Sequence, residues 1–234
     1  MLKKIIAEAI GTFSLVLIGT GAIVLGDEKA GLLGVALAFG FIVIAMAYSI
    51  GTVSGAHMNP AVSLAMYLNK RLNFKELLTY IAAQLFGALA GSALLKFLLG
   101  QVGRNTSNLG STILTEGVTI TGGFIIELIL TFIFVLVILT ATGQKGDPHL
   151  AGIIIGLTLI TLILVGGPTT GTSLNPARSF GPAILMGGEA LSQLWLYTLA
   201  PLLGGILASV VAKYVLDTEI GAPGVEQEKS ERTA

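Results

Sequence analysis

Six long apolar runs, separated by short polar segments, dominate the pattern of the sequence. They lie near residues 5–25, 31–51, 76–99, 122–142, 150–167 and 191–216. Each run has, or nearly has, the roughly 20 residues that an α-helix needs to cross the hydrocarbon core of a bilayer. The pattern therefore predicts an all-α membrane protein with six transmembrane helices. The segment that follows them, 218–234, is polar and is predicted to be a disordered tail.

Composition strengthens this interpretation. Hydrophobic residues make up 53% of the 234 residues and charged residues only 11%, whereas about 25% of the residues in a soluble domain are charged. The formal net charge is zero, which gives no reason to expect a nucleic-acid partner. The chain has no cysteine, so disulfides, thiolate metal sites and cysteine nucleophiles are excluded. We expect neither a metal nor a cofactor.

The two halves of the chain, about 1–100 and 120–217, repeat each other. Landmarks recur in order and at a nearly constant spacing: Glu8, Thr12 and Phe13 as Glu127, Thr131 and Phe132; Asn59-Pro60-Ala61 as Asn175-Pro176-Ala177; Tyr80 and Gly87 as Tyr197 and Gly204. Each half holds three spans, and three is odd, so the second half must enter the membrane from the opposite side. The sequence thus predicts a single transmembrane domain over 1–217, built from an inverted repeat.

Cationic residues gather on one side of this predicted domain. If the N-terminus is cytoplasmic, the inner residues are Lys3, Lys4, Lys70, Arg71, Lys75, Lys145, Lys213, Lys229 and Arg232. Only Lys29, Lys96 and Arg104 fall on the outer side. Because cytoplasmic loops carry an excess of Lys and Arg, we expect both termini, with the tail, in the cytoplasm.

A short segment in each half carries an Asn-Pro-Ala box. Asn is a favoured N-cap and Pro a favoured first helical residue, so each box is expected to start a half-helix that is too short to cross. In an inverted repeat, the two half-helices would meet near the midplane with their N-termini facing each other. Each N-terminus carries about half a positive charge, which opposes cations, including hydronium, and hardly affects a neutral solute.

The backbone that leads into each half-helix cannot face lipid, because its carbonyl groups would lack hydrogen-bond partners. It must therefore line a cavity. The residues expected to present acceptors along that cavity are Gly55, Ala56 and His57 in the first half and Gly171, Thr172 and Ser173 in the second half.

Two Asn-Pro-Ala boxes in inverted halves, the second continuing as Arg178-Ser179-Phe180-Gly181-Pro182-Ala183, resemble the aquaporin or major intrinsic protein family across nearly the whole chain. The resemblance implies six helices with two re-entrant half-helices, a plasma-membrane location, a homotetramer and one pore in each subunit. It also implies a passive channel for water that excludes ions and protons.

The family's narrow outer filter is carried over by spacing from the boxes, and falls on Phe39, Ile163, Thr172 and Arg178. Ile163 departs from the water-specific members, which usually have His there, and is similar to archaeal aquaporins. Ser179 stands where the glycerol branch typically has Asp, which favours water. Tyr197 matches the water branch, although Thr198 replaces its usual Trp. A broader facilitator of glycerol, hydrogen sulfide or carbon dioxide remains the alternative.

The buried acids Glu8 and Glu127 could serve a proton relay or catalysis. Their symmetric placement, and the family resemblance, favour a structural role in holding the two re-entrant loops. His57 could be a gate or pH sensor because His titrates near neutral pH, and we interpret it as a structural pore-lining residue.

Two other functional classes fit the sequence less well. Secondary transporters also have inverted repeats with broken helices, but coupled transport usually needs ionisable groups at the site, and only Arg178 is apparent near the boxes. An intramembrane hydrolase would need a nucleophile with a partner, and no His, Cys or Asp supplies one. We therefore expect a channel and not an enzyme.

Overall fold

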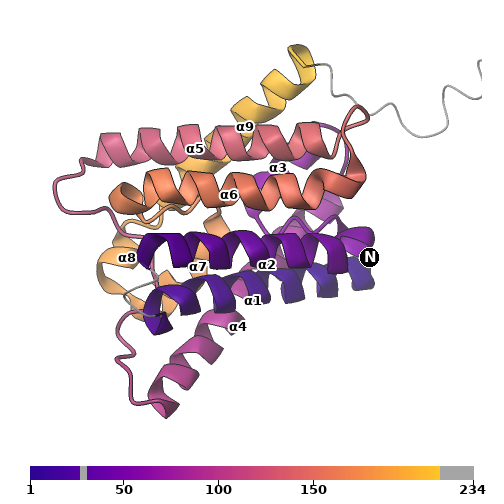
Figure 1. Cartoon of the computed structure of the whole chain (residues 1–234). Helices are drawn as coiled ribbons and strands as arrows, with labels where there is room; N and C mark the ends of the chain where they lie inside the picture. The colour runs from indigo at the N-terminus through magenta and orange to yellow at the C-terminus, as the bar shows by residue number, and fades with distance from the viewer. Residues whose placement is uncertain (27–30, 217–234) are drawn as a thin grey trace, which may run out of the picture.

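The computed structural model describes residues 1–26 and 31–216, and within them every regular element is helical (Figure 1). The helices long and apolar enough to cross a membrane are α1 (Leu2–Leu25), α2 (Gly31–Ser54), α4 (Phe74–Gln101), α5 (Ile120–Ala141), α6 (Pro148–Thr170) and α9 (Leu196–Tyr214). The prediction of six transmembrane helices is thus confirmed. The tail predicted over 218–234 lies outside the described residues.

The last predicted span was too long at its start. The apolar run expected over 191–216 is divided between the short α8 (Gly188–Ser192) and α9, which begins at Leu196. Hydropathy could not separate them, because Leu191 and Leu194 are as apolar as the residues of the span. Between the two helices, Gln193 accepts a hydrogen bond from the Leu114 backbone N–H at 2.9 Å, so this turn is held by the loop between α4 and α5 instead of continuing the helix.

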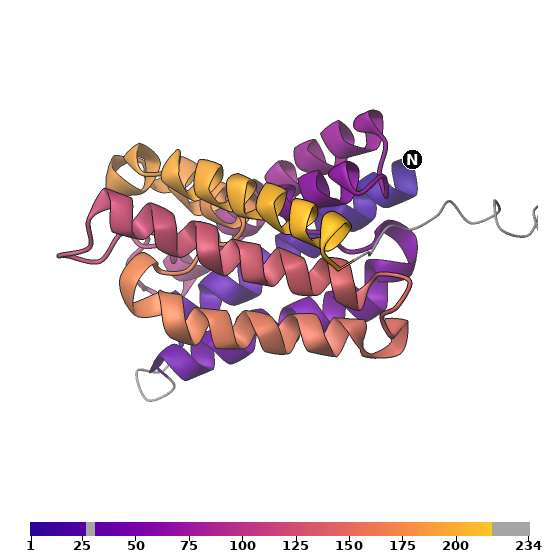
Figure 2. The ribbon, with the colours of Figure 1, turned by 90° about the horizontal axis from the view of Figure 1, so that it is seen from above.

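Two half-helices, α3 (Pro60–Leu68) and α7 (Pro176–Met186), complete the fold. The long helices run side by side, with α9 beside α5 along most of its length (Figures 1 and 2). In the first half α1 packs against α4, and in the second half α5 packs against α9 in the equivalent way. The halves join through α2 and α6, while α3 packs on α9 and α7 packs on α4.

Glycine allows the closest helix approaches, and it does so symmetrically. A Cβ added at Gly87 would lie 2.3 Å from the Ala9 carbonyl oxygen, and one added at Gly204 would lie 2.5 Å from the Leu128 carbonyl oxygen. A side chain at either position would therefore push α4 from α1, or α9 from α5. Small residues at such crossings are how membrane helices pack without a hydrophobic driving force between them.

Polar contacts gather several segments at one end of the bundle. Lys4 Nζ forms an ion pair with Glu76 Oε1 at 2.8 Å, which holds the start of α1 against the start of α4. Arg71, in the turn between α3 and α4, donates to Thr142 Oγ1 at 2.7 Å and to the Leu139 carbonyl oxygen at 2.9 Å. These contacts bring the N-terminus, the α3–α4 turn and the end of α5 to the same face.

Candidate pore

The two half-helices begin as the sequence predicted. Asn59 caps α3, and its Oδ1 accepts from the Ala61 backbone N–H at 2.8 Å. Asn175 caps α7, and its Oδ1 accepts from the backbone N–H groups of Ala177 at 3.0 Å and Arg178 at 3.3 Å. Proline follows each Asn at the first helical position, where its missing N–H costs nothing.

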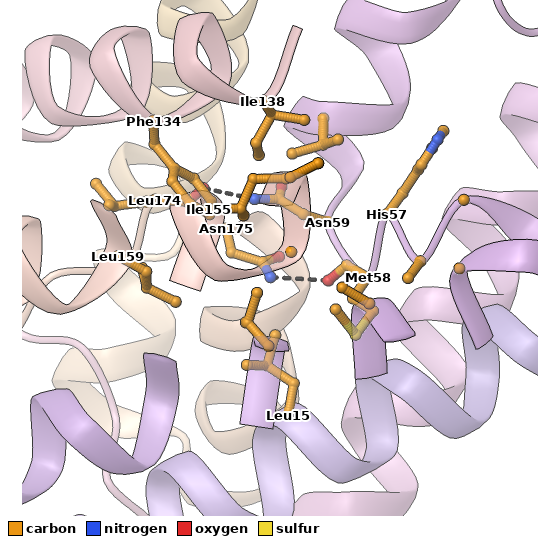
Figure 3. Close-up of a pocket in the computed structure, with 18 of the residues that line it drawn as sticks. Leu15, His57, Met58, Asn59, Phe134, Ile138, Ile155, Leu159, Leu174 and Asn175 are labelled. Atoms are coloured by element: carbon orange, nitrogen blue, oxygen red, sulfur yellow. Dashed lines mark hydrogen bonds between the residues drawn. The ribbon is translucent and has the colours of Figure 1, made fainter. Parts of the chain in front are cut away.

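The same two asparagines join the half-helices to each other (Figure 3). Asn59 Nδ2 donates to the Leu174 carbonyl oxygen at 2.7 Å, and Asn175 Nδ2 donates to the Met58 carbonyl oxygen at 2.8 Å. Each amide is therefore fixed, with its oxygen on its own helix and its nitrogen directed across. An amide nitrogen carries two hydrogens, so one N–H of each Asn is left to face the cavity that both residues line.

A cavity of about 420 Å³ runs past the paired asparagines. Apolar side chains form most of its wall, among them Leu15, Val43, Val62, Phe134, Ile138 and Leu159. Of the residues predicted to present acceptors, Gly55, Ala56, His57, Thr172 and Ser173 line it. Gly171 does not belong to the lining. A Cβ added at Gly171 would lie 3.5 Å from Thr112 Cα in the loop between α4 and α5. The lining is therefore mostly apolar, with polar groups contributed by the two loops.

Both re-entrant loops hold non-glycine residues in the left-handed region of backbone space. The φ values are +50° for Ala56 and +51° for Met58 in one loop, and +46° for Thr172 and +52° for Leu174 in the other. Each such residue costs on the order of 1–3 kcal/mol and persists only where the surroundings enforce it. The strain recurs at equivalent positions, so both loops need an external support.

Glu8 supplies that support in the first half. Its carboxylate is fully buried and accepts hydrogen bonds from Ser54 Oγ at 2.7 Å, from the backbone N–H groups of His57 at 2.9 Å and Met58 at 2.7 Å, and from Gln84 Nε2 at 2.7 Å. One side chain of α1 therefore fixes the end of α2 and the strained loop together.

Glu127 has the equivalent position in the second half. It is fully buried and accepts from Thr170 Oγ1 at 2.6 Å and from the backbone N–H groups of Ser173 and Leu174, each at 2.9 Å. Every group that forms a hydrogen bond with either carboxylate is a donor. This is the geometry of a fixed hydrogen-bond acceptor.

Sequence reasoning missed part of this support. Tyr80 was recognised only as a repeat landmark, and Tyr197 only as a landmark and as a residue typical of the water branch. Their hydroxyl groups donate, at 2.8 Å in both cases, to the carbonyl oxygens of Ser54 and Thr170, which are the last residues of α2 and α6. The recurrence of two buried tyrosines was the signal that could have revealed the role. Gln84 has no equivalent in the second half and gave no signal.

The four residues predicted to form the filter all border the cavity and are 5% exposed or less. Arg178 lies with its Cζ atom 5.0 Å from the centre of the Phe39 ring, and its Nη1 donates to the Gly110 carbonyl oxygen at 2.7 Å. Within residues 1–26 and 31–216, Arg178 Nε and Thr172 Oγ1 have no hydrogen-bond partner. Phe39 and Ile163 add apolar surface to this polar pair.

The outer loop between α4 and α5 is a second element that the sequence did not indicate. It carries Gly110, whose carbonyl holds Arg178. Met186 Sδ accepts from Ser111 Oγ at 2.8 Å, and Thr112 Oγ1 lies 2.6 Å from Ser179 Oγ, so both ends of α7 hold the loop. A loop without periodicity gives no pattern from which such contacts could be read.

The chain is similar in sequence to known proteins over most of its length. The family model described as "Major intrinsic protein" matches residues 1–212. The Glycerol uptake facilitator protein-like 6 of Lactiplantibacillus plantarum is 44% identical over 215 residues, which cover 91% of this chain and 97% of the relative. An Aquaporin Z of Rhodopseudomonas palustris is 41% identical over 221 residues, which cover 89% of this chain and 91% of the relative.

A solved structure shows the same likeness in three dimensions. The aquaglyceroporin from Plasmodium falciparum superposes with a TM-score of 0.83 at 25% identity, covering 92% of this chain and 96% of that chain. The family match includes both repeats, and members of the family are channels, which sets the hydrolase interpretation aside at the level of the family. The chain therefore belongs to the major intrinsic protein family, the aquaporin family of membrane channels.

Proposed function

We propose that this channel conducts water passively and excludes ions and protons. The observation that carries the proposal is the pair of half-helix N-termini joined by Asn59 and Asn175 beside the cavity. Each terminus contributes about half a positive charge at the same point of a low-dielectric path. A cation, or a proton moving along a water file, meets this field, and a neutral water molecule passes as an acceptor of the Asn N–H groups.

Arg178 adds a second barrier. It is 2% exposed, and one of its nitrogens is held by the Gly110 carbonyl while the guanidinium borders the cavity. A buried cation in a membrane protein is costly and is retained for function. Here it would repel other cations and donate hydrogen bonds to a passing oxygen.

We also propose that the domain over 1–217 lies in the plasma membrane with both termini in the cytoplasm, and that it forms a homotetramer with one pore in each subunit. The distribution of Lys and Arg supports the orientation. The gathering of Lys4 and Arg71 at one end of the bundle is in keeping with it. Family resemblance supports the tetramer.

A broader facilitator of small neutral solutes is the second candidate, and Ile163 favours it. In place of a donor, Ile163 adds an apolar face to the filter, as the resemblance to archaeal aquaporins implies. Together with Phe39 it adds apolar surface to a lining that also holds Arg178 and Thr172, each of which has a polar atom without a hydrogen-bond partner among the described residues. Such an opening suits solutes that have an apolar edge and a polar edge, such as glycerol, and also admits hydrogen sulfide or carbon dioxide.

A coupled transporter is less well supported. Among the described residues that line the cavity there is no Asp or Glu, the groups that usually bind a coupling ion. The carboxylates of Glu8 and Glu127 are turned toward the loops and are fully buried. Flux is therefore expected to be linear with the gradient.

The test is reconstitution in liposomes followed by stopped-flow light scattering. Shrinkage is recorded first with an impermeant osmolyte and then with glycerol, beside empty liposomes and an Arg178→Ala variant. Fast shrinkage without glycerol re-swelling is the expected result for a water channel. Slow shrinkage with rapid re-swelling in glycerol would overturn the water proposal and establish the broader facilitator.

A further inference from the structure

A chain of hydrogen bonds in the first half ends at His57, and only its last bond has an equivalent in the second half, where Ser179 Oγ lies 2.6 Å from Ser173 Oγ. It runs from Glu8 to Gln84 Nε2 at 2.7 Å, from Gln84 Nε2 to Ser63 Oγ at 2.9 Å, and from Ser63 Oγ to His57 Nδ1 at 3.1 Å. In the repeat, Ser173 stands at the position of His57 and Pro201 at that of Gln84.

The donors and acceptors of this chain have a fixed direction. Glu8 accepts on both carboxylate oxygens from backbone N–H groups, which can only donate. The amide of Gln84 must therefore turn its nitrogen toward Glu8, because the reverse orientation would bring two acceptors together. The second hydrogen of that nitrogen goes to Ser63.

Ser63 is thereby made an acceptor toward Gln84, and its own hydrogen is left for another partner. The acceptor in reach is His57 Nδ1. A neutral imidazole has one donor nitrogen and one acceptor nitrogen. If Nδ1 accepts from Ser63, the ring hydrogen must be on Nε2.

The other ring nitrogen is available to the cavity. Among the described residues His57 Nε2 has no hydrogen-bond partner, and the half-buried ring borders the cavity. Tyr80 packs edge-on against it with ring centres 5.2 Å apart, which fixes its plane. Gly55 leaves the space beside Nε2, because an added Cβ there would lie 3.0 Å from that atom. In Figure 3 His57 lies to one side of the Asn59 and Asn175 pair.

We propose that Gln84 and Ser63 are positioning residues that hold His57 as the Nε2–H tautomer, so that His57 is a further fixed donor to solutes that pass the paired asparagines. The proposal rests on the proposed channel function, since the donor matters only where a solute passes. Glu8 has two tasks in this arrangement: it holds the loop, and it sets the direction of the chain that ends in the pore.

Magic-angle-spinning NMR of the full-length protein in liposomes, with ¹⁵N-labelled histidine, tests the tautomer. The chain has two histidines, so a His149→Gln variant assigns the signals. The spectrum is recorded near pH 8, well above the ordinary His pKa of about 6.5. We expect His57 to be protonated at Nε2 alone, with polarisation transfer from water to that N–H. Protonation at Nδ1 would overturn the proposal, because Nδ1–H would then donate to Ser63 Oγ instead of accepting from it.

Variants then test the positioning residues. Ser63→Ala removes the donor to Nδ1, and Gln84→Leu frees Ser63 to turn elsewhere. Each is expected to shift the tautomer ratio roughly 2- to 10-fold toward Nδ1–H, the range for losing one net hydrogen bond. Ser92→Ala is the matched control, since Ser92 is a buried hydroxyl on α4 without a partner within the described residues. An unchanged ratio in both test variants would show that Ser63 and Gln84 do not set the tautomer.

The water flux of the same liposomes is measured separately. A channel without water flux but with the Nε2–H tautomer would contradict the proposed function and leave the geometry of His57 intact. A conducting channel with the other tautomer would contradict only the positioning role. An Nε2–H group that receives no polarisation from water would show that the donor does not face the path.

Discussion

The two re-entrant loops solve the same structural problem with different partners. In the first half Glu8 accepts from four groups, the last of which is Gln84 on α4. In the second half Glu127 accepts from three groups. Val62 stands at the position of Arg178 in the first half.

This difference separates two roles within the repeats, the support of a re-entrant loop and the contact with a solute in the cavity. A buried carboxylate needs either an opposite charge or enough donors to replace its lost hydration. In the second half the cation Arg178 borders the cavity and donates to the Gly110 carbonyl oxygen. The first half has Val62 at the equivalent position, and Glu8 there has a fourth donor, Gln84. Three of the four residues predicted to form the filter thus lie in the second half, although the backbone supports are nearly identical.

Removal of the two carboxylates should have the largest effect. Glu8→Leu removes the acceptor of four hydrogen bonds and Glu127→Leu that of three, and each buried group left unsatisfied costs about 1–3 kcal/mol. We expect a loss of folded channel in both cases, measured as aggregation in size-exclusion chromatography and loss of a cooperative thermal transition in detergent.

The matched Gln variants sharpen that experiment. Glu8→Gln and Glu127→Gln keep the size of the side chain and one acceptor oxygen but place an N–H group against donors. An intermediate loss of thermal stability is expected. Wild-type stability of the Leu variants would mean that the loops do not depend on these side chains.

The next largest effect should come from Arg178. Arg178→Ala removes the cation and widens the filter, and we expect the flux of glycerol to rise at least tenfold, which needs a barrier lower by only about 1.4 kcal/mol. Water flux should be retained. Stopped-flow shrinkage and glycerol re-swelling measure both. Arg104→Ala, which removes an exposed arginine that does not line the cavity, is the control and should leave glycerol flux near the wild-type value.

The sequence allowed most of the backbone plan to be predicted, and for a physical reason. Spans, half-helices and the inverted repeat follow from hydropathy, from Asn and Pro at helix starts, and from recurring landmarks, all of which are local properties. The contacts of Gln84 with Glu8 and of Gly110 with Arg178 join residues 76 and 68 positions apart. Hydropathy patterns and helix propensity carry no information about such pairs, so the roles of Gln84 and Gly110 were not recognised.

A smaller change in glycerol flux is expected from a substitution at Ile163, which lies in the second half. Ile163→His restores a polar donor to the filter and narrows its apolar side. Since pocket discrimination of this kind is worth about 1–3 kcal/mol, we expect glycerol flux to fall on the order of tenfold while water flux changes little. The same light-scattering assay applies. If glycerol flux stays unchanged, Ile163 does not form part of the filter.

The smallest effect should be equal in the two halves. Tyr80 and Tyr197 are both fully buried and donate at the same 2.8 Å to the last carbonyl of α2 and α6. Tyr80→Phe and Tyr197→Phe keep the ring and delete one hydroxyl group, so each should lower the free energy of unfolding by about 0.5–1.5 kcal/mol. Thermal unfolding in detergent, with both variants and the double variant, measures this. Because the hydroxyl groups serve separate loops, their effects should add. A loss at Tyr197 much larger than at Tyr80 would mean that Arg178 makes the second loop more dependent on its support, and that the supports are less symmetric than their distances.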